Sequence, residues 1–117
     1  MTDIATPTVL LNWPVAKANI DRMVDKARRH GLRLRPHLKT AQCLEIARYF
    51  ESKGVGQFTC SSFSMARYFA EGGIKDITVA FPVNLREAEA INSLASQISL
   101  NVLVVNAESL AWLKKDL

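Results

Sequence analysis

Three residues that can do chemistry stand at alternate positions in one short run. Arg35, His37 and Lys39 lie within Arg-Leu-Arg-Pro-His-Leu-Lys-Thr, residues 33–40. In an extended strand, alternate side chains share one face. In an α/β protein, the carboxyl end of a strand is the edge where ligands bind. A lysine there can be desolvated, lose its proton and attack a carbonyl carbon. We therefore interpret Lys39 as a covalent nucleophile; a solvating surface lysine is the alternative that spacing alone leaves open.

His37 and a group of serines give weaker signals. His37 is either a hydrogen-bonded structural histidine or a group that contacts a cofactor. Ser61, Ser62 and Ser64 follow a predicted strand, where they either cap a helix or contact a phosphate or substrate at its N-terminus. The sequence has no glycine-rich dinucleotide fingerprint, no P-loop and no paired Cys/His metal motif.

The cysteines, the apolar runs and the N-terminus indicate in which cell compartment the protein resides. Cys43 and Cys60 lack the close spacing of a metal-binding pair, and we expect both to be reduced, buried thiols. No run reaches the roughly 18 apolar residues of a membrane span. The N-terminus lacks the basic and apolar regions of a secretory signal. Together these features predict a cytoplasmic protein.

Charge is mild but clustered. The net charge is +4, and much of it comes from five basic residues that flank His30, namely Lys26, Arg28, Arg29, Arg33 and Arg35. Basic residues near a helix C-terminus offset the helix dipole, and an anion site is the alternative. No aromatic residues interleave with the cluster, so we expect no nucleic-acid partner.

Short apolar runs alternate with helical patterns along the chain. Strands are predicted at residues 8–11, 33–37, 57–60, 76–81 and 101–105. A helix follows each strand: Asn12, Ser62 or Ser64, Asn84 and Asn106 mark four of the starts, and Cys43 lies on the helix after residues 33–37. The strand at 101–105 is apolar on both faces, as helix-covered parallel strands are. The pattern predicts a single α/β domain, which is either an open doubly wound sheet or part of a (β/α) barrel.

Several segments resemble one enzyme family in order along the chain. They are Thr6-Pro7, the helix through residues 19–23, Leu-Arg-Pro-His-Leu-Lys-Thr at 34–40, Thr59-Cys60, residues 70–77 and Phe-Pro-Val at 81–83. Together they resemble the N-terminal part of the D-threonine aldolase and D-serine dehydratase group. These are alanine-racemase-like, fold-type III enzymes that use pyridoxal 5′-phosphate (PLP).

The resemblance implies a fold and a site. The fold is a partial (β/α) TIM-type barrel of about four βα units, preceded by one strand and helix that lead toward a β domain. Residues 1–117 would form the N-terminal part of this barrel, without its C-terminal half or the β domain. Lys39 would form the Schiff base with PLP, and His37 and Arg35 would also bind the cofactor. A divalent metal would be held only in the missing C-terminal part.

The resemblance also implies a D-amino acid substrate and lyase or racemase (isomerase) chemistry. The family often continues after Lys-Thr with His-Lys, where this chain has Ala41 and Gln42, and it commonly has acidic residues where Met65 and Arg67 stand. These departures concern the substrate more than the lysine.

An open half barrel would expose strand edges and apolar faces. We therefore expect a homo-oligomer or the remainder of a longer chain, and an isolated chain that is inactive. Two alternatives stay open: a non-catalytic half-barrel interaction module, and an unrelated small α/β domain that binds an anionic partner.

Overall fold

A computed structural model describes residues 4–116, which divide into two units at Arg33 and Leu34. The first unit contains helix α1 (Trp13–Arg29). Asn12 caps it as predicted, because the Asn12 side chain accepts a hydrogen bond of 3.2 Å from the Val15 N–H. Gly31 follows the helix with φ of 63°, a left-handed conformation that favours glycine.

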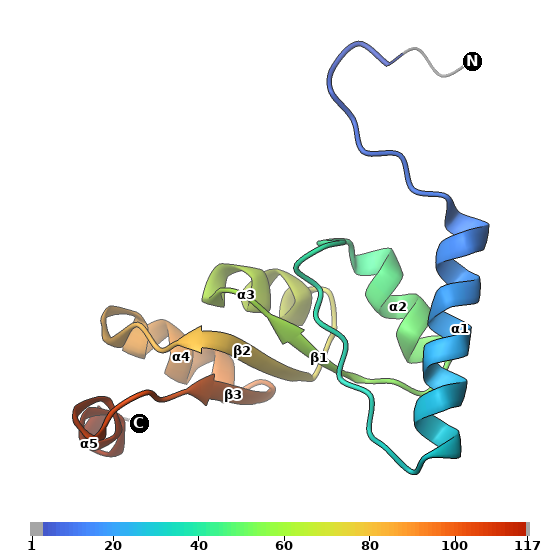
Figure 1. Cartoon of the computed structure of the whole chain (residues 1–117). Coiled ribbons are helices and arrows are strands. Elements are labelled where there is room, and N and C mark those ends of the chain that lie inside the picture. The colour runs from blue at the N-terminus through green and yellow to red at the C-terminus, as the bar shows by residue number, and fades with distance from the viewer. Residues whose placement is uncertain (1–3, 117) are drawn as a thin grey trace. The chain divides into compact units, whose positions relative to one another are not determined.

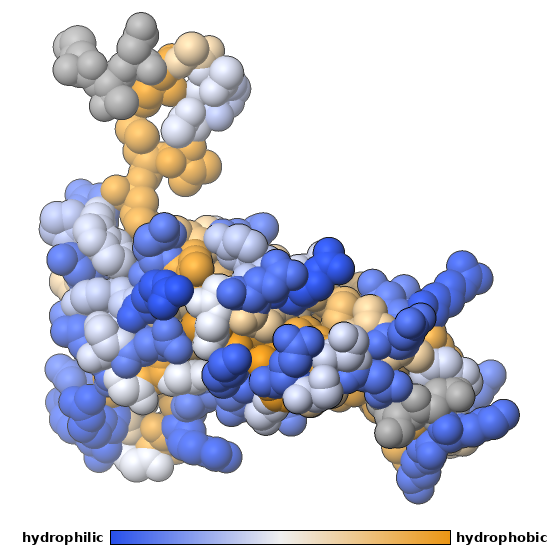
Figure 2. Space-filling view, turned by 180° about the vertical axis from the view of Figure 1, so that it is seen from behind, coloured by the Kyte–Doolittle hydropathy of each residue, from blue (hydrophilic) through white to orange (hydrophobic). Residues whose placement is uncertain are grey.

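The strand predicted at residues 8–11 does not form. These residues have no regular structure, and Val9, Leu10 and Leu11 are 96%, 75% and 56% exposed. Figure 2 shows the segment as a chain of apolar residues. The prediction was wrong because a strand needs a partner to satisfy its backbone, and the sheet of the described chain contains β1, β2 and β3 alone.

The second unit is built on a parallel sheet in the order β1-β2-β3 (Figure 1). The strands are β1 (Gln57–Cys60), β2 (Asp76–Pro82) and β3 (Ser99–Leu103). The helices are α2 (Leu44–Ser52), α3 (Phe63–Glu71), the short 3-10 helix η1 (Leu85–Glu87), α4 (Ala88–Ala95) and α5 (Ala107–Asp116). The predicted α/β class and the parallel sheet are therefore confirmed.

The segment at 33–37 is not a full strand, contrary to the prediction. It makes one parallel bridge, between His37 and Thr59. Thr59 donates to the Pro36 carbonyl at 2.8 Å, and the Leu38 N–H donates to the Thr59 carbonyl at 2.9 Å. The ladder stops there because Pro36 has no N–H to donate toward β1.

The last predicted strand is displaced by two residues. β3 covers residues 99–103 rather than 101–105, so Val104 and Val105 lie beyond its end. Its pairing with β2 becomes irregular between Val79 and Pro82 and ends where Pro82 faces Leu103. The Val83 N–H still donates to the Leu103 carbonyl at 2.9 Å, and Asn84 then caps η1, so the chain leaves the ladder there.

The two faces of the sheet differ, although we had expected strands that are apolar on both. One face supplies Phe58, Cys60, Ile77 and Val79 to a buried cluster, in which α2, α3 and α4 contribute Ala47, Ala66, Phe69 and Leu94. The other face consists mainly of polar residues, half-buried or exposed: Gln57, Thr59, Asp76, Thr78, Ser99 and Asn101. An exposed apolar sheet face was therefore a wrong expectation, because the strands alternate in polarity.

Candidate functional site

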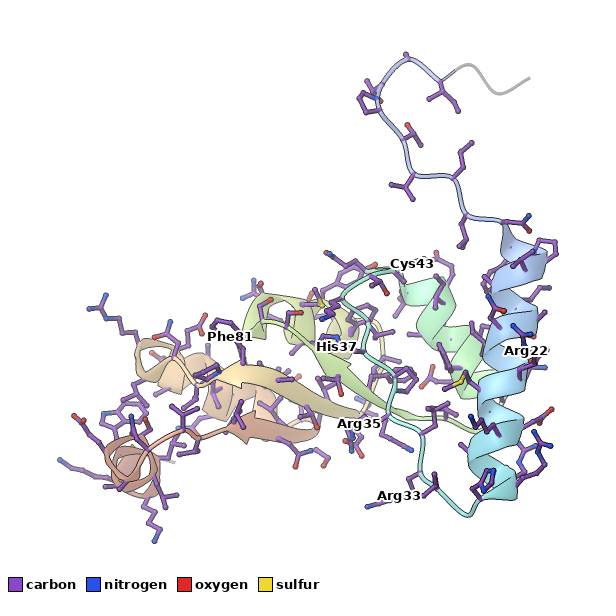
Figure 3. All side chains as sticks on the ribbon, viewed as in Figure 1. Arg22, Arg33, Arg35, His37, Cys43 and Phe81 are labelled. Carbon is purple, nitrogen blue, oxygen red and sulfur yellow. The ribbon has the colours of Figure 1, made fainter. Side chains whose placement is uncertain are left out.

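The strand register orders the polar face into rows. Gln57, Asp76 and Ser99 are aligned in one row, and Thr59, Thr78 and Asn101 form the next. His37 is aligned with Thr59, which puts Arg35 near the first row and Lys39 beyond the second, toward the carboxyl edge. Leu38 is buried in the cluster on the other face. Figure 3 shows Arg35 and His37 along the same extended segment, which leads toward Cys43 and α2.

Arg35 is held by an acidic residue that the sequence analysis had not singled out. Its Nη1 donates to Asp76 Oδ1 at 2.7 Å, and its Nη2 donates to Asp76 Oδ2 at 3.1 Å. Nη1 also donates to the Phe58 carbonyl at 3.2 Å. This is a bidentate, charge-assisted pair between residues 41 positions apart in sequence.

His37 is tied to the backbone of Lys39. The Lys39 N–H donates to His37 Nδ1 at 3.2 Å, so in the neutral ring the proton resides on Nε2. Burial, and next the positive charge of Lys39, hold the pKa of His37 below its ordinary value of 6.5. The imidazole is therefore kept neutral with Nδ1 as the acceptor.

Lys39 stands in a tight turn over residues 38–41 that leads to α2, and it is exposed. The turn is closed at Gln42, whose N–H donates to the Leu38 carbonyl at 2.8 Å and whose side-chain amide donates to the Lys39 carbonyl at 3.1 Å. Gln42 has φ of 46°, a left-handed value that is unusual for a residue other than glycine. Lys39 is thus held through its backbone, and its amine reaches solvent.

Two clefts lie on the α3 side of this edge. A cleft of about 360 Å³ is lined by Gln42, Ser62, Ser64, Met65, Tyr68 and Phe69. A larger one of about 530 Å³ extends from Ser61 to Phe81, Asn84 and Val102. Lys39 lines neither of them. Ser62 caps α3, as one of the two interpretations predicted, because its hydroxyl accepts from the Met65 N–H at 3.2 Å.

The cysteines differ from each other. Cys60 is fully buried and free, and burial raises the pKa of its thiol to about 11. Cys43 is free but only half-buried, so the expectation of two buried thiols was wrong for it. The Cys43 thiol donates to Glu45 Oε2 at 2.9 Å, a contact that lowers the pKa of Glu45.

The basic cluster follows the helix-end interpretation in part. Lys26, Arg28 and Arg29 lie in the last turn of α1, and Arg28 pairs with Asp25 at 3.4 Å. Within residues 4–116, no three His, Cys, Asp or Glu side chains gather closely enough to hold a metal ion. None of the helices in that range is long and apolar enough to cross a membrane.

Known proteins resemble the chain closely. No family model matches it. A 3-hydroxy-D-aspartate aldolase of Paracoccus denitrificans is 38% identical over 96 residues, which are 80% of this chain and 24% of that protein. A D-threonine aldolase of Arthrobacter sp is 32% identical over 92% of the chain and 29% of its own length. A D-serine dehydratase of Dictyostelium discoideum is 30% identical over 94% and 29%.

Over most of its length the chain is similar to a D-threonine aldolase and a D-serine dehydratase. It spans about a quarter of the length of these relatives. Among solved structures, D-threonine aldolase from Filomicrobium marinum matches 97% of the chain with a TM-score of 0.90 and 27% identity, over 31% of its own length. An alanine racemase-like protein from Idiomarina loihiensis matches 86% of the chain with a TM-score of 0.78 and 28% identity, over 27% of its length. The expected resemblance to the N-terminal part of this group is confirmed, and the alternative of an unrelated α/β domain was wrong.

Proposed function

We propose that the chain supplies the lysine-bearing part of a PLP-dependent enzyme that acts on D-amino acids. Residues 1–117 would be the first part of an alanine-racemase-like barrel, in which Lys39 holds the cofactor covalently. The observation that carries the proposal is the placement of Lys39. It is the exposed amine on a tight turn at the carboxyl edge of a parallel sheet, in a chain related to D-amino acid aldolases and dehydratases.

The donor chemistry of the residues at this turn fits such a group. A primary amine is the nucleophile that an aldehyde cofactor requires, and the neutral His37 ring lies beside the backbone of Lys39. Bound PLP supplies an electron sink for negative charge that develops on the α-carbon of an amino acid.

The chain's own residues would then perform three tasks. Lys39 would hold the cofactor through its amine, and the same amine is the base that would take the proton from the α-carbon of the substrate. His37, with Nδ1 occupied by the Lys39 N–H, keeps Nε2–H as a donor toward the site. Gln42 holds the turn through the Lys39 carbonyl, so the lysine backbone stays in place while its side chain moves.

The rest of the pocket would come from further βα units of a longer polypeptide or from a second copy. Phosphate sites in barrels of this kind lie on late loops, and Lys39 lines neither cleft described above. We therefore propose that the isolated 117 residues react with PLP at Lys39 without turning over a D-amino acid.

Covalent trapping tests this function. The chain is incubated with PLP, reduced with borohydride and digested, and the modified lysines are located by mass spectrometry. We expect label at Lys39 above every other lysine. Lys39→Arg should abolish that label and the visible absorbance of the bound cofactor, whereas Lys75→Arg, at another exposed lysine, should leave both unchanged. Uniform labelling of all lysines would instead support a non-catalytic interaction module.

A further inference from the structure

The guanidinium of Arg35 is committed to contacts within the sheet. Its Nη1 donates hydrogen bonds to Asp76 Oδ1 and to the Phe58 carbonyl, and its Nη2 donates one to Asp76 Oδ2. The Arg35 and Asp76 side chains are only 30% and 37% exposed. Both terminal nitrogens of Arg35 are therefore occupied in a partly buried place, where water competes less for them.

These contacts join three pieces of chain. Arg35 belongs to the segment that leads to Lys39, Phe58 to β1, and Asp76 is the first residue of β2. One side chain thus crosses from the segment over β1 to β2. In the part of the chain that the structure describes, the other side-chain hydrogen bonds of the segment reach only β1 or its own turn.

The segment needs such a contact because its backbone is poorly bonded. Pro36 cannot donate, so two backbone hydrogen bonds, both to Thr59, attach the segment to β1. On the N-terminal side of Pro36, attachment depends on side chains: the Gln57 amide donates to the Leu34 carbonyl at 2.8 Å, and Arg35 makes the contacts described above. Loss of Arg35 would leave that side to one neutral hydrogen bond.

From this arrangement we infer that Arg35 is a positioning residue, which with Asp76 clamps the Lys39 segment onto the sheet, and that it does not bind the cofactor itself. The inference rests on the proposed function only in naming Lys39 as the residue that is positioned. To bind a phosphate, the guanidinium would have to leave a carboxylate that it already contacts through two bonds.

Amide hydrogen exchange measured by NMR, without any cofactor, tests the clamp. The reporters are the Leu38 and Thr59 amides, which form the bonds between the segment and β1, and the Val79 amide in β2 serves as the reference for global opening. Arg35→Lys keeps the charge but loses the bidentate fork, and Asp76→Asn removes the charge of the partner. Glu71→Gln is the matched control, since it breaks an exposed Arg–Glu pair with Arg67 in α3.

In both clamp variants we expect exchange at Leu38 and Thr59 to rise about tenfold relative to Val79. Glu71→Gln should leave that ratio unchanged. Equal acceleration of all three amides, or none at all, would overturn the inference, because it would show that the contact does not hold the segment locally.

A second measurement separates positioning from phosphate binding. Inorganic phosphate is titrated into the wild-type chain while the Arg35 side-chain N–H signals are followed. We expect them to stay in place, and a saturable shift confined to Arg35 would refute the inference. If Lys39 is not trapped by PLP but the exchange result holds, the proposed function fails and the clamp stands.

Discussion

The buried thiol of Cys60 makes the stability of the protein depend on alkaline pH. Its native pKa is about 11, compared with an ordinary value of 9.0, which we take for the unfolded chain. Because the native pKa is the higher one, the native state keeps a proton that the unfolded state loses in this range. The contribution is complete below pH 9, and the free energy of unfolding falls as the pH rises toward 11.

The size of the effect follows from these two values. At pH 10 the unfolded thiol is mostly ionised and the native one mostly protonated, which costs on the order of 1 kcal/mol of stability, whereas at pH 8 both are mostly protonated and the cost is negligible. Other groups also titrate in this range, so the useful quantity is a difference between variants. Cys60→Ala removes the thiol, and its packing cost does not depend on pH.

Urea denaturation at pH 8 and pH 10, with a reductant present, measures this difference. Between the two pH values we expect wild type to lose on the order of 1 kcal/mol more than Cys60→Ala. Cys43→Ala is the control at a half-buried thiol and should lose as much as wild type. If Cys60→Ala and wild type lose the same amount, the thiol is not desolvated as described and the reasoning is refuted.

Two further predictions concern packing and capping. Phe58 is fully buried and packs edge-to-face on Phe50 at 6.1 Å between ring centroids, whereas Phe81 is 63% exposed. Phe58→Leu should therefore lower the free energy of unfolding by about 1–2 kcal/mol and Phe81→Leu by less than about 0.5 kcal/mol; equal losses in urea titrations would contradict this. Ser62→Ala should cost about 1 kcal/mol through the lost cap of α3, and circular dichroism melts should show a clear drop for it that Ser64→Ala does not reproduce.

Local features could be predicted from the sequence because their causes are local. Asn12, Ser62 and Asn106 cap the helices that they were expected to cap, since a cap bonds to an N–H three residues away. The end of α3 also has a local cause, because its C-cap residue is a glycine, Gly72. The order of strands and helices in the second unit followed from the same signals.

Features that depend on distant partners could not be predicted in the same way. The strand at 8–11 needed a neighbour that no local pattern identifies. Arg35 was grouped with Lys39 by alternation, but its partner Asp76 lies 41 positions away. The alternate polar positions Asp76 and Thr78 indicate a polar face of β2, but the sequence analysis used this strand only for its β-forming residues. Gln42 departs from the residue that the family often has at this position, but its residue type does not predict its left-handed backbone conformation.

Pro36 has a consequence for how the sheet can grow. The segment that carries it covers β1 with a single bridge, and because the missing N–H would face β1, that bridge cannot be extended into a full ladder. Among the described strands, β3 pairs with β2 alone, so its other border can accept a parallel neighbour. A further strand that needs a regular neighbour can therefore pair along β3, at the border of the sheet away from Lys39.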